Sequence, residues 1–352
     1  MDTQRLILAA LMTISMGCSK SVDSFSTLPE AELYKQTADI QQRKVDFLWV
    51  IDNSGSMNTS QTKLADYFGK FIERFQTYNY DFHIGVIATD AYKFYFDDNA
   101  NWAKLRDGAG TTHSGIFVID PTTPNLIPTF QKNVKQGIKG SGDERAFQSF
   151  EAALDPVLGI NTDSGFRRAD AYLSIIIVSD EDDFSQTDPP GTMTSTENYE
   201  DPRLFNIAHY VDFLDRTTGS YPALRSYSVS AIAILDDVCR VSLSSGARKI
   251  SQRYIEMVEA TGGTKASICS DFSESLSFLS DKILELTSVF KLNRDPIVSS
   301  IKVFVDEHEV VNDATNGWTY DSVGNQVIFH GTAIPANGAG VRVAYDPTSV
   351  KL

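Results

Sequence analysis

The chain is organised around the stretch Val45-Asp46-Phe47-Leu48-Trp49-Val50-Ile51-Asp52-Asn53-Ser54-Gly55-Ser56-Met57. Its first seven residues are almost all apolar, β-branched or aromatic, which predicts a short buried strand. The strand ends in Asp52, Ser54 and Ser56, which alternate along a tight turn before a helical pattern begins. A carboxylate and two hydroxyls in this arrangement can present three oxygens to one point. Oxygen ligands suit a hard divalent cation, so the turn predicts an Mg²⁺ site, with Mn²⁺ or Ca²⁺ as alternatives.

A second acidic residue follows a second buried strand. Residues 172–178 are almost entirely apolar and lead into Asp180. Strands separated by helical patterns are typical of a parallel sheet, and open α/β sheets bind ligands at the carboxyl ends of their strands. We therefore expect Asp52 and Asp180 to lie at one edge of the same sheet.

The fold class follows from this alternation. Residues 43–292 predict an α/β domain, doubly wound around a mostly parallel sheet. Beyond Pro296 the apolar period changes to two and turn signals separate the runs, which predicts a small all-β domain over 296–352.

The pattern Asp52-x-Ser54-x-Ser56, together with Asp180, resembles the metal-ion-dependent adhesion site of von Willebrand factor A domains. The resemblance implies that both serines bind the cation directly and that both aspartates act directly or through water. In that family a second loop before a helix supplies a Thr. Here Ser141 aligns with that Thr, and Glu144 is a rival ligand. One coordination position is then left open for a carboxylate from a protein partner.

The N-terminus predicts export. Arg5 precedes a mostly apolar run, residues 6–16, which is too short to span a bilayer. Gly17-Cys18 resembles a bacterial lipobox, which predicts a signal peptide over 1–17 and lipidation of Cys18, with ordinary secretion as the alternative. Residues 18–42 are polar and are expected to be a tether. Ser19 favours an outer-membrane lipoprotein that faces the periplasm or the cell surface.

Two further cysteines, Cys239 and Cys269, remain if Cys18 carries lipid. In an oxidising compartment an even pair favours a disulfide, and the alternative is two buried thiols. The formal charge of -15 and the lack of a basic run exclude nucleic acid as an expected partner.

Two segments near the predicted metal edge are less regular. Lys93–Phe96 predicts a short edge strand, with an exposed aromatic contact surface as the alternative. Residues 184–203 lack periodicity and leave from the metal edge, where loops carry specificity.

We expect a membrane-anchored, metal-dependent module that binds a protein partner through an acidic residue of that partner, and not an enzyme. One alternative is an envelope scaffold whose metal site is closed by an acidic residue of the chain itself: Asp90, Glu181, Asp182 or Asp183. The other is a metal-dependent hydrolase that uses Asp52. Hydrolases with an Asp-x-Asp nucleophile need a second carboxylate where Ser54 stands, and the chain has no Gly-x-Ser-x-Gly motif around these serines.

Overall fold

The computed structural model describes residues 34–39, 43–190, 199–222, 225–243, 249–336 and 338–348. The predicted signal peptide and Cys18 lie outside these residues, so both stay predictions. No helix in the described ranges is long and apolar enough to cross a membrane.

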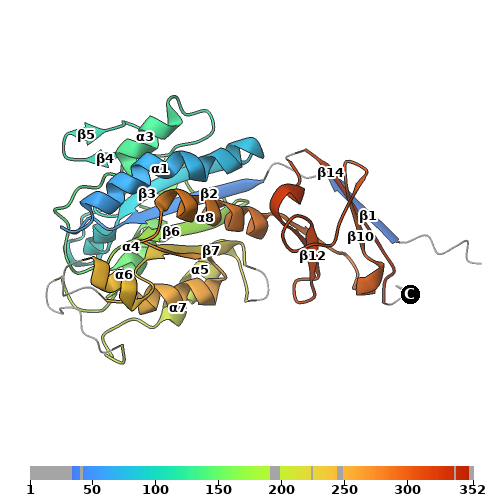
Figure 1. Ribbon diagram of the computed structural model, residues 1–352. Helices are drawn as coiled ribbons and strands as arrows, with labels where there is room; N and C mark the ends of the chain where they lie inside the picture. Colours follow the sequence, from blue (N-terminus) through green and yellow to red (C-terminus); the bar gives the residue numbers. More distant parts are fainter. Residues whose placement is uncertain are drawn as a thin grey trace, which may run out of the picture. The chain divides into compact units, whose positions relative to one another are not determined.

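A five-stranded parallel sheet forms the centre of the α/β part (Figure 1). Its strand order is β3-β2-β6-β7-β8, and each neighbouring pair is parallel. Beyond this sheet, Ile119 adds a single antiparallel bridge to Ile84 on the outer edge of β3. The bounds of the strands are Lys44–Ile51 (β2), Asp81–Ala88 (β3), Tyr172–Val178 (β6), Tyr227–Ala233 (β7) and Lys265–Ser267 (β8).

Helices cover both faces of this sheet because alternate residues of β2 point to opposite sides. Phe47 and Trp49 pack edge-on against Phe71, with ring centroids 5.1 and 5.2 Å apart. Leu48 and Val50 belong to the apolar cluster on the other face. The first face carries α1 (Asn58–Thr77), α3 (Leu126–Asn133) and α8 (Phe272–Thr287), and the second carries α4 (Ala146–Leu154), α5 (Ile207–Thr218) and α7 (Gln252–Thr261).

Two antiparallel sheets make up the β part. Their orders are β1-β14-β10-β11 and β12-β13-β9. The predicted fold class, a doubly wound α/β sheet followed by a small all-β part, is thereby confirmed. The strands are Tyr34–Asp39 (β1), Val289–Lys291 (β9), Lys302–Val305 (β10), His308–Val310 (β11), Trp318–Asp321 (β12), Gln326–Phe329 (β13) and Gly340–Tyr345 (β14).

These two sheets include strands from outside residues 296–352, the range predicted for the β domain. Strand β1 lies inside the range 18–42 that predicted a tether, yet its six residues pair antiparallel with β14. Strand β9 lies inside the range 43–292 but pairs with β13. The partner of β1 is about 300 residues away in the sequence, and the partner of β9 lies across a predicted domain boundary. The polarity of the local sequence therefore could not reveal either pairing.

The predicted edge strand at Lys93–Phe96 is wrong. Residues Thr89–Lys93 form a 3-10 turn (η1), and Phe94–Asp97 form a short helix (α2). The outer edge of β3 is instead taken by Ile119, whose backbone exchanges hydrogen bonds of 2.7 and 2.9 Å with Ile84. An aromatic run adopts a strand only where an edge is free to pair with it.

The remaining elements are short. Helix α6 carries Cys239, which forms a disulfide with Cys269 at a Cα–Cα separation of 5.5 Å. The other bounds are Gly108–Ala109 (β4), Thr112–His113 (β5), Thr162–Ser164 (η2), Asp237–Ser242 (α6), Val298–Ser300 (η3) and Gly331–Ala333 (η4).

Candidate metal centre

The turn after β2 lies where the winding of the sheet reverses. The chain passes from β2 to β3 on one side, then continues to β6 on the other side of β2. Asp52 N donates to the carbonyl of Val178 at 3.0 Å, so the ends of β2 and β6 are joined directly. The carboxyl edge at such a switch point is where doubly wound folds bind ligands.

Asp52 is fully buried and holds this turn together. Its Oδ1 accepts a hydrogen bond from Ser54 N at 2.7 Å, and its Oδ2 accepts one from Ser179 Oγ at 2.6 Å. Burial raises the pKa of Asp52 to about 6, against the lowering effect of these two bonds. The carboxylate is therefore held in place by the fold but lacks full compensation for its charge.

The two serines and Asp180 converge beside it. Ser54 Oγ and Ser56 Oγ are 3.2 Å apart, and Ser56 Oγ donates to Asp180 Oδ1 at 2.8 Å. The structure thus brings four of the five predicted metal ligands to one place: Asp52, Ser54, Ser56 and Asp180.

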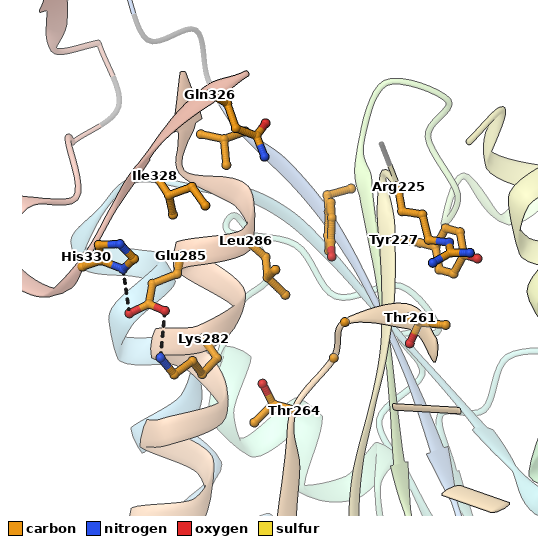
Figure 2. Close-up of a pocket in the computed structure, with 14 residues that line it drawn as sticks. Arg225, Tyr227, Thr261, Thr264, Lys282, Glu285, Leu286, Gln326, Ile328 and His330 are labelled. Atoms are coloured by element: carbon orange, nitrogen blue, oxygen red, sulfur yellow. Dashed lines mark hydrogen bonds and ion pairs between the residues drawn. The ribbon is translucent and has the colours of Figure 1, made fainter. Parts of the chain in front are cut away.

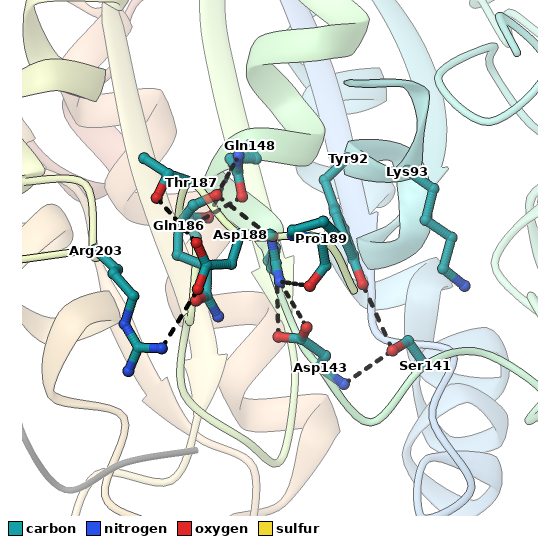
Figure 3. Close-up of polar contacts among 12 residues, drawn as sticks. Tyr92, Lys93, Ser141, Asp143, Gln148, Gln186, Thr187, Asp188, Pro189 and Arg203 are labelled. Atoms are coloured by element: carbon teal, nitrogen blue, oxygen red, sulfur yellow. Dashed lines mark hydrogen bonds and ion pairs between the residues drawn. The ribbon is translucent and has the colours of Figure 1, made fainter. Parts of the chain in front are cut away.

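Ser141 is held differently. Its Oγ accepts hydrogen bonds from Asp143 N at 3.1 Å and from the Tyr92 hydroxyl at 3.5 Å (Figure 3). Its backbone N donates to Asp90 Oδ1 at 3.2 Å. Within the described residues, none of its hydrogen bonds reaches the four side chains above. The aligned position therefore serves to fix the loop.

Glu144 is the better placed rival. It is 1% exposed, and its Oε1 is buried without a hydrogen-bond partner. Burial raises the pKa of Glu144 well above its usual range, and the negative charges of Asp52, Glu181 and Asp90 raise it further. A buried carboxylate oxygen without a partner is unfavourable unless a cation or a donor meets it. The charge of Asp52, in the metal-type turn, acts on this carboxyl group.

Three of the other acids at this edge already have protein partners. Asp90 pairs with Lys93 at 2.8 Å. Asp183 pairs with Arg253 at 3.3 Å. Asp182 accepts from the Tyr199 hydroxyl at 2.8 Å and from Arg253 N at 3.2 Å.

A buried arginine links the second and third loops of the site. Arg145 is fully buried and pairs with Asp143 at 2.7 Å. The same guanidinium donates to the carbonyls of Gln186 at 3.3 Å and Asp188 at 2.7 Å. The Gln148 side chain exchanges two 3.0 Å bonds with the backbone of Gln186 (Figure 3). The start of the 184–203 segment is therefore fixed to the helix that follows Glu144.

The side chains present fit a divalent cation. In the described part of the chain, no group of three or more His, Cys, Asp or Glu side chains could hold a metal by itself. The hydroxyls of Ser54 and Ser56 add two oxygen donors to the carboxylate of Asp180, and the buried carboxylate of Asp52 lies in the same turn as the serines. An all-oxygen donor set with unbalanced buried negative charge favours a hard cation.

A pocket at the opposite end of the sheet has different properties. It has a volume of about 370 Å³ and reaches Tyr172, where β6 begins, roughly 20 Å along the strand from Val178, where β6 ends. Its charged groups are already paired: Glu285 contacts Lys282 at 2.8 Å and His330 at 3.5 Å (Figure 2). We place the candidate site at the metal-type edge.

No protein-family model matches the sequence, and no curated protein does. Solved structures match at low identity. They include the pilus adhesin SpaC from Lactobacillus rhamnosus GG in its open conformation, with a TM-score of 0.42 and 11% identity over 89% of this chain and 40% of the adhesin. Proximal thread matrix protein 1 from the mussel byssus, with a zinc-occupied MIDAS motif, has a TM-score of 0.38 and 11% identity over 74% of this chain and 52% of its own.

The pilus adhesin RrgA from Streptococcus pneumoniae has a TM-score of 0.33 and 9% identity, covering 88% of this chain and 58% of the adhesin. This chain thus spans between 40% and 58% of the length of these three proteins. At these identities and TM-scores the likeness says nothing of what this chain binds.

Proposed function

We propose that this chain is a metal-dependent protein-binding module that takes a carboxylate of its partner onto a divalent cation. The observation that carries the proposal is the convergence of Ser54, Ser56 and Asp180 beside the buried carboxylate of Asp52. The charge of Asp52 also raises the pKa of the buried Glu144. Ser54, Ser56, Asp52, Asp180 and Glu144 would hold the cation. The cation would supply a local positive charge that attracts an acidic side chain.

The residues of the proposed metal site have separate roles. Asp52 and Glu144 are buried, so they would set the affinity for the cation without contacting a partner. Ser56 is exposed and would lie at the entrance. A net charge of -15 does not prevent binding of an acidic partner, because exposed charges beyond about 8 Å are screened at physiological salt. Mg²⁺ is the cation that we propose, and we further propose that Cys18 anchors the chain to the outer membrane.

The decisive test is capture of a partner by the full-length chain from envelope extract, with Mg²⁺, with EDTA, and with the variant Asp52→Ala. The matched control is Asp163→Ala, which removes an exposed acid from η2. We expect capture by the wild type and the control only in Mg²⁺, and no capture by Asp52→Ala. Equal capture in EDTA would rule out a metal-dependent interface.

A closed structural site is the second candidate, and Glu181 is the acid that supports it. Glu181 is partly exposed, and its negative charge raises the pKa of the buried Glu144. If Glu181 closes the site, Glu181→Gln weakens the binding of Mn²⁺ by tenfold or more. An open site predicts a change of less than about threefold, measured by calorimetry.

A further inference from the structure

A lysine-rich segment lies immediately before the second loop of the candidate site. Residues 132–139 read Lys132-Asn133-Val134-Lys135-Gln136-Gly137-Ile138-Lys139, with three lysines and no acidic residue. The whole chain has 31 basic and 46 acidic residues, so this local excess of positive charge runs against the composition.

The backbone of this segment is fastened to the metal-type turn. Gln61 Nε2 lies 2.8 Å from both the Asp52 carbonyl and the Gly137 carbonyl. Gly140 N donates to the Asn53 carbonyl at 2.8 Å. A Cβ at Gly140 would lie 2.4 Å from the Asn53 side chain, so only glycine allows this approach. Lys139 directly precedes Gly140, so the Cα atoms of these two residues are about 3.8 Å apart.

One side of this segment is buried and hydrogen-bonded, and the other side is exposed to solvent. Asn133 is fully buried, and its amide bonds Ser114 Oγ at 2.6 Å and the Ile116 carbonyl at 2.8 Å. Lys135 and Lys139 are exposed, and no ion pair joins either to a described carboxylate. Ile138, between them, is 44% exposed.

We propose that Lys135, Ile138 and Lys139 form a docking rim for an acidic segment of the partner protein. This inference rests on the proposed function: one carboxylate of the partner takes the cation, and its neighbouring acids meet the two ammonium groups. An apolar side chain between those acids contacts Ile138. Charges at the rim of an interface set the association rate and its salt dependence more than the final packing.

Acidic polypeptide is the partner class that this surface fits. Two lysines flanking one apolar side chain match a short acidic segment with a hydrophobic residue inside it. A nucleic acid or an anionic membrane would place many phosphates along a chain with 46 acidic and 31 basic residues, whereas a short acidic segment needs to contact only the two lysines and the cation.

The probe is a fluorescent synthetic peptide with four acidic residues around one leucine, and its binding to the full-length chain is followed by anisotropy in Mg²⁺. The variant is Lys135→Glu combined with Lys139→Glu. The control combines Lys70→Glu with Lys302→Glu, two exposed lysines on α1 and β10. We expect about tenfold weaker binding for the rim variant, from reversal of two nearby charges, and less than about twofold for the control. The Mn²⁺ affinity of the rim variant should stay within about twofold of the wild type.

Three results of the peptide assay would overturn the rim. They are failure of the peptide to bind the wild type, equal affinity of the rim variant and the wild type, and equally tight binding of an oligonucleotide with the same charge. Partner capture that depends on Mg²⁺ and Asp52 but ignores the rim variant would remove the rim and leave the proposed function standing. Peptide binding that depends on the two lysines but is unchanged by EDTA would show that the lysines bind acidic peptide without the cation. That result would overturn both the proposed rim beside the metal and the proposed function.

Discussion

Asp52→Asn should stabilise the metal-free protein and abolish its stabilisation by metal. The pKa of Asp52 is raised from 3.8 to about 6, a shift of about two units, which corresponds to about 3 kcal/mol. Because the folded-state pKa is the higher one, protonation of Asp52 stabilises the folded state. This stabilisation is fully present below pH 3.8 and is lost as the pH rises through about 6. At pH 7.5 without metal, the ionised carboxylate therefore opposes folding.

The substitution also loses a hydrogen bond. The carboxylate accepts from Ser54 N and Ser179 Oγ, whereas an amide has one oxygen and can accept only one of these in the same geometry. A buried donor left without a partner costs about 1–3 kcal/mol. Since the relief of the charge is about 3 kcal/mol, we expect a net gain of about 0–2 kcal/mol for Asp52→Asn in EDTA at pH 7.5.

Bound Mg²⁺ should make the wild type more stable than Asp52→Asn, the reverse of the order in EDTA. At a Mg²⁺ concentration about 100 times the dissociation constant, binding adds about 2.7 kcal/mol to the wild type, whereas the variant gains little. Urea unfolding at pH 5 and pH 7.5, each in EDTA and in Mg²⁺, measures all four free energies of unfolding. Asp163→Asn is the control and should change none of them. A variant less stable than the wild type in EDTA at pH 7.5, or one stabilised equally by Mg²⁺, would refute the reasoning.

The remaining predictions concern the ligands, the disulfide and the arginine link. Glu144→Gln should weaken Mn²⁺ binding by tenfold or more and Ser141→Ala by less than about threefold, measured by calorimetry. The reverse ranking would restore the family's second-loop position as a ligand. Cys239→Ser should lower the free energy of unfolding by about 3–4 kcal/mol, because the bond spans 30 residues, and Cys269→Ser should match it in chemical denaturation. Arg145→Ala should lower the free energy of unfolding by about 3–5 kcal/mol, because it leaves Asp143 buried without its ion-pair partner. Limited proteolysis of this variant should then cut within 184–203, and a protease pattern like that of the wild type would count against the link.

The choice between Ser141 and Glu144 could not be made from the sequence. Both lie in the same loop, and the family resemblance favoured Ser141 by alignment alone. The fold adds what the alignment lacks, because it places Ser141 beside the Tyr92 hydroxyl and the backbone of Asp143, and it buries Glu144 Oε1 without a hydrogen-bond partner. The sequence places Glu144 two residues before the apolar helix α4, but whether Glu144 is buried depends on what packs over it.

The sequence by itself determined the doubly wound sheet and the metal-type turn. Apolar strands of seven or eight residues, each ending in an acid, leave few alternatives because periodicity and strand ends are local properties of the chain. Only the tertiary structure decided that Tyr34–Asp39 is a strand, that Phe94–Asp97 is helical, and that a lysine-rich segment adjoins Asn53. Each of these depends on a partner that is distant in sequence, and the pairing of distant residues is set by packing and free hydrogen-bonding edges.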